Sequence, residues 1–230
     1  MAKFLAKKTP VDIDVLVRAL QNAWESQFGS VPNTDSVLLL VAQWALETGW
    51  GKSMYCYNLG NVKAGMATEN YCYYACSEIL TNSTADRWVK QDPKTAVLIR
   101  KVGKDRSEVR FYPENVCCKF KAFETLEAGV SDFLEVLYNR FAFAWLYVCK
   151  GNPAGYAHAL KQAHYYTADE VIYTKALVGV FNMLKKRVRI PIYSAVLGKS
   201  TSSLEDLEMM ASIHDKDIGD EDLAFDSIEC

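Results

Sequence analysis

The sequence predicts a mainly helical α+β fold with one small β lobe and an acidic C-terminal tail. Apolar residues recur at helical spacing near the start of the chain and again after residue 125, whereas the stretch between is enriched in aromatic and β-branched residues. Half of the 230 residues are apolar, which suffices for one substantial core. We therefore expect one domain over residues 1–198 and a disordered tail over residues 199–230, where acids accumulate.

Two helices are expected before residue 52. Residues 11–29 carry apolar side chains three and four positions apart, and Gly29 suits the left-handed end of a helix. A turn at residues 32–35 caps the next helix, whose residues 37–46 are almost uniformly apolar. Because such a helix leaves no face for water, it belongs in the middle of the domain.

A small β lobe is expected in the middle of the chain, as a hairpin or three strands. Residues 71–80 have the aromatic enrichment of a strand, and two further extended runs follow at residues 95–102 and 108–112. The polar segments between them, residues 82–94 and 103–107, are expected to be connections. A long structureless connection at this place suits a lid or a binding feature.

Helices return after residue 125 and close the domain. Each expected segment carries apolar residues at helical spacing, and Asn152-Pro153 and Thr167-Ala168-Asp169 supply helix starts. The expected helices span residues 126–141, 143–150, 153–164 and 169–187.

The charge is divided unevenly along the chain. Residues 1–203 hold 25 Lys plus Arg against 18 Asp plus Glu, a net of +7, while residues 204–230 hold ten acids and one lysine, a net of −9. A basic body suits an anionic polymer, but no nucleic-acid-binding motif accompanies it, so we expect no nucleic acid as a partner. Without a long apolar run or a signal-peptide pattern, we expect synthesis in the cytoplasm and no membrane insertion.

Glu47 is the ionisable group that ends the apolar helix. Its carboxyl lies against that helix and near Trp44 and Trp50, so it is expected to lose hydration, and it also sits at the negative end of the helix dipole. Both effects favour the protonated form, which is the form that a general acid needs. The alternative is a solvated glutamate at an ordinary helix end.

The seven cysteines do not predict a metal centre. Cys72 and Cys76, with the adjacent Cys117 and Cys118, supply enough thiols for zinc, but the chain lacks a paired C-x-x-C knuckle. We expect neither a metal nor another cofactor.

Four sequence blocks resemble one enzyme family. ALETGWGKS (residues 45–53) and NLGNVKAG (residues 58–65) are similar to the signature of the glucosaminidase (FlgJ-type, glycoside hydrolase family 73) branch of the lysozyme superfamily. Residues 120–137 and 151–177 resemble two later segments, and the blocks keep the family's order. The resemblance implies a lysozyme-like helical bundle whose small β lobe walls a cleft opposite the helix that carries Glu47.

The resemblance also implies catalytic roles. Cleavage of a β-1,4 bond between amino sugars needs a proton donor, here Glu47, and usually a second carboxylate. The family carries the second group in the β lobe, where Glu78 is the nearest match and Glu69, Asp86 and Asp92 compete with it. The substrate's own 2-acetamido group is a third source of assistance.

Four substrate contacts are implied by the same resemblance: Trp50, Asn58, Tyr165 and Tyr173. An aromatic ring with a hydroxyl suits a sugar, because it offers an apolar face and a hydrogen-bonding group. The chain departs from the family pattern at Gly60-Asn61, where Phe-Gly is usual, and at His164, where glycine is usual. These departures bear on the geometry of the sugar subsites.

The function expected on this basis is hydrolysis of the glycan strands of peptidoglycan by an endo-β-N-acetylglucosaminidase. The alternatives are a lytic transglycosylase, a muramidase, or an inactive wall-binding or virion structural protein. Such a protein, of phage or bacterial origin, is expected to reach the cell wall by release, injection or virion delivery. A protein partner for the acidic tail is a further expectation.

Overall fold

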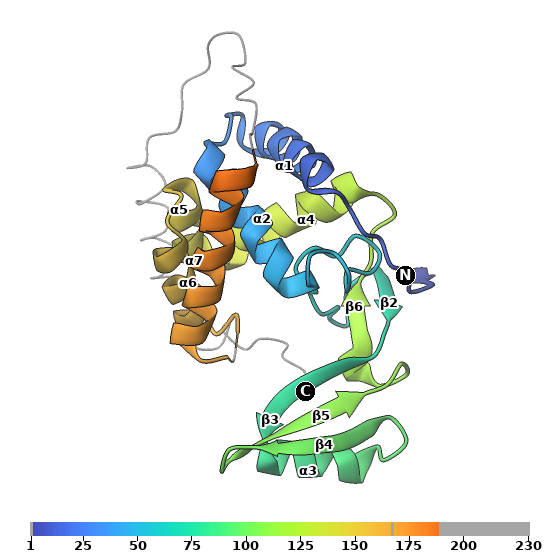
Figure 1. Ribbon diagram of the computed structural model, residues 1–230. Helices are drawn as coiled ribbons and strands as arrows, with labels where there is room; N and C mark the ends of the chain where they lie inside the picture. The colour runs from blue at the N-terminus through green and yellow to red at the C-terminus, as the bar shows by residue number, and fades with distance from the viewer. Residues whose placement is uncertain (1, 167, 189–230) are drawn as a thin grey trace.

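The computed structural model describes residues 2–166 and 168–188, and it has a helical body with a small β lobe beside it (Figure 1). The predicted fold class, mainly helical α+β, is confirmed. The expected tail at residues 199–230, and the domain boundary before it, lie outside the described residues. The helices of the body are α1 (Ile13–Phe28), α2 (Thr34–Thr48), α4 (Leu126–Arg140), α5 (Ala142–Cys149), α6 (Pro153–Gln162) and α7 (Glu170–Arg187).

Helix α2 is the centre of the body, as its apolar sequence predicts. Residues 36–45 are all buried, and α2 packs against α1, α5 and α7. The Asn33 side chain accepts a hydrogen bond from the Ser36 amide at 2.8 Å and so caps the start of the helix. Gly49 ends it in the left-handed conformation, with a φ of 55°. The six helices of the body therefore form close to the predicted boundaries, because both their periodicity and their caps are local.

In the described part of the chain the strands form two separate sheets of three. The first sheet has the order β1-β2-β6 and the second, in the lobe, the order β3-β5-β4. Their bounds are β1 (Ala2–Phe4), β2 (Asn70–Tyr73), β3 (Cys76–Thr81), β4 (Ala96–Val102), β5 (Arg106–Phe111) and β6 (Lys119–Lys121). The expected three-stranded lobe is thus present. The single strand expected at residues 71–80 is wrong, because the chain leaves one sheet after Tyr73 and enters the other at Cys76.

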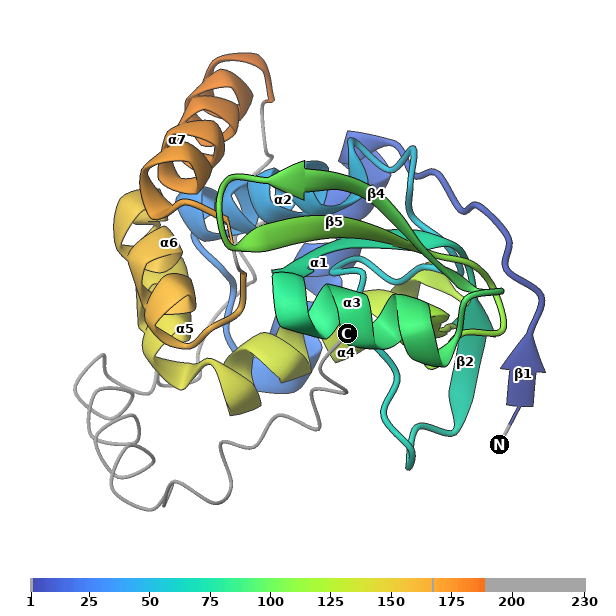
Figure 2. The same cartoon turned by 90° about the horizontal axis from the view of Figure 1, so that it is seen from below.

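Helix α3 (Asn82–Gln91) replaces the structureless connection that was expected at residues 82–94. The Thr81 side chain caps it by accepting a hydrogen bond from the Thr84 amide at 3.3 Å. Its Ala85, Trp88 and Val89 pack in the core of the lobe, where Trp88 meets the Phe111 ring edge-on at 5.7 Å between centroids. Figures 1 and 2 show α3 on the face of the β3-β5-β4 sheet that is turned away from the helical body. The segment is a structural helix and not a lid.

Candidate active site

The end of α2 is a tight and well-bonded turn. Gly49, Trp50 and Gly51 all have positive φ, between 55° and 77°. The Thr48 hydroxyl donates to the Trp44 carbonyl at 2.6 Å and accepts from the Gly51 amide at 2.9 Å. A Cβ at Gly51 would lie 2.9 Å from the Trp44 ring, so only glycine lets the chain pass this closely. The turn therefore fixes the last turn of α2, which carries Glu47.

Glu47 has the environment that its sequence predicts. Its side chain is partly buried, and the Tyr173 hydroxyl donates a hydrogen bond to its Oε1 at 3.2 Å. Burial raises the pKa of Glu47 from 4.5 to about 7, while the bond from Tyr173 acts in the opposite direction. The carboxyl is thus protonated in a large part of the molecules at neutral pH. This is the protonation state that proton donation requires.

Three tyrosines surround Glu47, and two of them were predicted. Tyr165 and Tyr173 lie within electrostatic reach of its carboxyl, as does Tyr156 beneath them. Burial raises the pKa of all three phenols well above the usual range, and the charge of Glu47 adds to the rise for each of them. They therefore stay neutral and add no competing charge. The structure brings together Glu47, Tyr165 and Tyr173, although Tyr173 is 126 residues away from Glu47 in the sequence.

Two buried residues of this site were not predicted from the sequence. The Tyr156 hydroxyl donates a hydrogen bond to the Gln43 side-chain oxygen, and both residues are fully buried. Gln43 lies one turn before Glu47 on the same face of α2. A single glutamine in an otherwise apolar run was the available signal, because a buried amide needs hydrogen-bond partners.

Glu78 lies in the lobe and has a partner of its own. It pairs with Val109 across β3 and β5, and its Oε1 is 2.9 Å from the Lys63 ammonium nitrogen. About a third of its side chain is exposed. Lys63 belongs to the NLGNVKAG block, so this block reaches the lobe as well as the end of α2.

The competing carboxylates have other surroundings. Glu69 is exposed just before β2, and Asp86 is exposed on α3. Asp92 ends α3 and accepts hydrogen bonds from the Thr95 hydroxyl and, at 3.2 Å, from the Asn115 amide group. Its role in the lobe is therefore structural.

Asn58, which was predicted to contact the substrate, has a supporting position in the turn that follows α2. Asn58 is only 1% exposed. Its amide nitrogen donates to the carbonyls of Val62 at 2.9 Å and Lys121 at 3.1 Å, and its oxygen accepts from the Val62 amide at 2.8 Å. All these bonds hold the turn that follows α2. Trp50, by contrast, is 38% exposed at the same end of α2 as Glu47, so its ring is accessible to a sugar.

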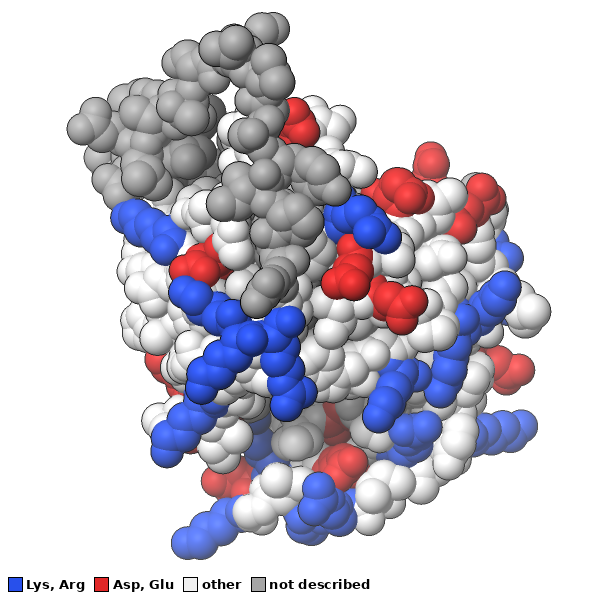
Figure 3. Space-filling model, turned by 45° about the horizontal axis from the view of Figure 1, so that its top comes forward, with Lys and Arg blue, Asp and Glu red and all other residues white. Residues whose placement is uncertain are grey.

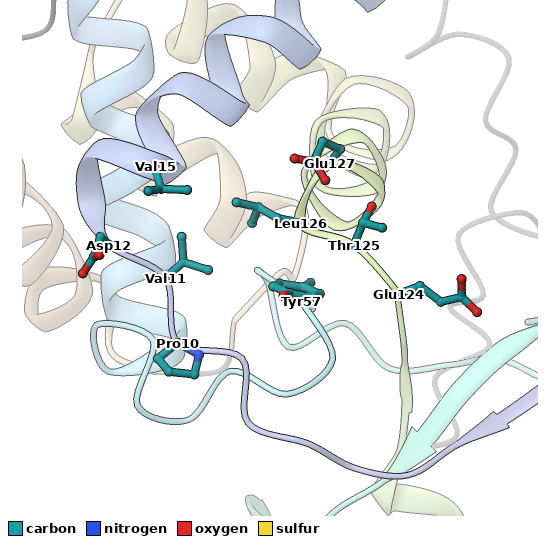
Figure 4. A pocket seen from close by; sticks show the side chains of 9 residues that line it. All are labelled: Pro10, Val11, Asp12, Val15, Tyr57, Glu124, Thr125, Leu126 and Glu127. Carbon is teal, nitrogen blue, oxygen red and sulfur yellow. The ribbon is translucent and has the colours of Figure 1, made fainter.

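The surface between the helical body and the lobe is hollowed. In Figure 3 a recess lies between the helical body and the lobe, with Lys and Arg side chains on both sides of it. A different hollow lies between the starts of α1 and α4, where Val11, Tyr57 and Leu126 converge (Figure 4). None of the predicted site residues lines this second hollow.

No cluster of metal-binding side chains and no membrane span is found in the part of the chain that the structure describes. Within residues 2–166 and 168–188, no three His, Cys, Asp or Glu side chains are grouped so as to hold a metal ion. Among the same residues, no helix combines the length and apolar character needed to cross a bilayer.

Residues 33–186 match the family model named Glucosaminidase, described as mannosyl-glycoprotein endo-β-N-acetylglucosaminidase. Among solved structures, a peptidoglycan hydrolase mutant from Sphingomonas sp. A1 is 24% identical with a TM-score of 0.48, and the alignment covers 76% of this chain and 95% of that one. The glycoside hydrolase domain of FlgJ from Salmonella typhimurium is 18% identical with a TM-score of 0.42, over 90% of this chain and 100% of that one. A search of curated proteins found no match.

Proposed function

This chain belongs to the glucosaminidase family, and on that basis we propose that it hydrolyses the β-1,4 bonds of peptidoglycan glycan as an endo-β-N-acetylglucosaminidase. The observation that carries the proposal is Glu47, a partly buried carboxyl whose pKa is raised to about 7 at the end of the central helix. The sequence blocks that resemble the family include this residue and the turn that follows it.

Glu47 is the general acid in this proposal. In its protonated form it delivers a proton to the glycosidic oxygen as the bond to the anomeric carbon breaks. The Tyr173 hydroxyl holds Oε1 at 3.2 Å, which orients the carboxyl before the proton is transferred and stabilises the carboxylate afterwards. Because the neighbouring phenols stay neutral, the proton on Glu47 is the most acidic one in the cluster.

Glu78 is the proposed second carboxylate. Its carboxyl group forms an ion pair with Lys63, and a carboxylate at this place suits stabilisation of the positive charge at the anomeric carbon or activation of a water molecule. The two carboxyls come from opposite parts of the molecule, Glu47 from the helical body and Glu78 from the lobe. This arrangement leaves the recess between body and lobe for the glycan (Figure 3).

Aromatic and basic side chains supply the binding surface in this proposal. The exposed Trp50, three residues after Glu47 in the turn that ends α2, can stack its ring on a sugar face. Lys and Arg side chains around the recess suit the carboxylates of peptidoglycan stem peptides.

Mass spectrometry of the fragments released from purified sacculi tests the proposal. A glucosaminidase leaves N-acetylglucosamine at the new reducing end. Fragments that end in N-acetylmuramic acid would instead identify a muramidase, and anhydro-muramic ends would identify a lytic transglycosylase. The Glu47→Gln variant is the control and is expected to release no fragments, because an amide cannot donate the proton.

A further inference from the structure

Asn61 stands at the junction between the helical body and the segment that leads into the lobe. Its side-chain nitrogen donates to the backbone carbonyl of Glu47 at 2.5 Å. Its side-chain oxygen accepts from the Tyr74 hydroxyl at 3.1 Å. Tyr74 lies between β2 and β3, where the chain passes from the first sheet to the second. The side-chain amide of Asn61 therefore links the backbone of Glu47 to Tyr74 at the entrance of the lobe through two hydrogen bonds.

The orientation of this amide is fixed by its partners. A backbone carbonyl can only accept a hydrogen bond, so the nitrogen of Asn61 must face Glu47. The oxygen then faces Tyr74, whose buried phenol has a pKa raised well above the usual range and so keeps its proton. Tyr74 is itself held between the rings of Tyr55 and Phe120, at centroid distances of 4.4 Å and 4.0 Å. Tyr74 is thus held at the entrance of the lobe by aromatic residues of the first sheet and of the segment before it.

Asn61 also completes the end of α2. The last carbonyls of a helix lack partners within it. Here the Ala45 carbonyl accepts from Gly49 and Trp50, and the Thr48 carbonyl accepts from Ser53. The Glu47 carbonyl is bonded by Asn61 instead, from a segment 14 residues further along the chain.

The backbone of Asn61 explains why an asparagine is suited to this place. Its φ of 49° lies in the left-handed region, which glycine adopts freely and which asparagine tolerates better than most residues. The family pattern has glycine at this position, and glycine meets the backbone requirement but carries no side chain. The chain therefore keeps the turn and adds two hydrogen bonds to it.

We propose that Asn61 is a positioning residue, which sets the place of Glu47 relative to the lobe by bonding the Glu47 carbonyl and the Tyr74 hydroxyl at the same time. The inference rests on the proposed function, in which Glu47 is the acid. Its mechanism is geometric, because displacing a catalytic group by about 1 Å can cost on the order of 100-fold in rate.

The test compares Asn61→Gly, Tyr74→Phe and the double variant with the wild-type protein, using soluble uncross-linked glycan strands as substrate. Asn61→Gly keeps the left-handed backbone and removes both bonds, whereas Tyr74→Phe removes only the bond to the lobe. We expect Asn61→Gly to lower kcat by about 10- to 100-fold with little change in KM. Tyr74→Phe should lower kcat less, and it should have no further effect in the double variant, since its partner is already gone.

The pH profile separates positioning from mere stability. Loss of the Asn61 bond gives the end of α2 more freedom and its carboxyl more water, so the fall in activity at alkaline pH should begin at a lower pH in Asn61→Gly. The matched control is Glu114→Gly, which also places glycine at an exposed residue of positive φ, 95°, and should keep the wild-type profile.

The outcomes that overturn the inference are distinct. A wild-type protein without activity on the glycan overturns the proposed function and this inference together. An active wild type with unchanged kcat and pH profile in Asn61→Gly overturns the inference alone. If Asn61→Gly is too unstable to assay, Tyr74→Phe decides, and wild-type kcat in that variant overturns the link to the lobe.

Discussion

Glu47→Gln should make the protein more stable at neutral and alkaline pH. Glu47 has a pKa of about 7 in the folded protein, against 4.5 for an ordinary glutamate. Each pKa unit corresponds to about 1.36 kcal/mol, so ionisation of the buried carboxyl costs the folded state about 3 kcal/mol above pH 7. Glutamine has a similar shape, carries no charge, and can still accept the Tyr173 hydrogen bond.

The sign of this effect determines its pH dependence. Because the folded state holds the proton more tightly than the unfolded state, the penalty is absent below pH 4.5, grows between 4.5 and about 7, and is complete above that value. The gain in unfolding free energy in Glu47→Gln should therefore be close to zero at pH 4 and about 3 kcal/mol at pH 8.

Urea denaturation of both proteins at pH 4, 5.5 and 8 measures this gain directly. The control is Glu135→Gln on α4, where the exposed side chain should give no pH-dependent difference. Parallel stability curves for wild type and Glu47→Gln would refute the argument that burial raises the pKa of Glu47. The same variant should be inactive on sacculi, and full activity would refute its assignment as the acid.

Three further predictions follow from the site and the charge distribution. Tyr173→Phe removes a hydrogen bond that lowers the pKa of Glu47, so the alkaline loss of activity in a pH–rate profile should move to higher pH. An unchanged profile would contradict the role of Tyr173. Glu78→Gln should lower kcat by about 100-fold or more. The control is Glu108→Gln, which removes a glutamate that forms an ion pair with Arg100 on the same sheet and should keep the wild-type kcat. Equal activity in both variants would remove Glu78 from the mechanism. Deleting residues 204–230 should leave thermal stability unchanged and raise binding to sacculi at low salt, and the difference in binding should vanish as salt screens the charges. The control replaces the ten acids of this segment with amides. An unfolded deletion variant would show that the segment is part of the core.

The helices and the burial of Glu47 were predictable from the sequence, because both depend on neighbouring residues. Apolar spacing and caps placed α2 and the helices after residue 125 close to their observed bounds. The same local pattern placed Glu47 at the end of an apolar helix, where burial raises its pKa. Helix α3 could also have been predicted, since Ala85, Trp88 and Val89 follow helical spacing within the polar segment.

The remaining features depend on contacts between distant segments, which no local pattern encodes. Strand β1 pairs in parallel with β2, about seventy residues later, and the run at residues 71–80 is divided between two sheets. The bond between Asn61 and the Glu47 carbonyl exists only because the fold brings the turn after α2 back against the end of that helix. The sequence by itself determined that Glu47 ends an apolar helix and which segments are helical, because burial along one helix and helix capping are local effects. Only the tertiary structure decided which side chains are partners, because partners from distant segments are brought together by packing. Asn58 supports the turn after α2, Tyr156 bonds Gln43 next to Glu47, and Lys63 pairs with Glu78.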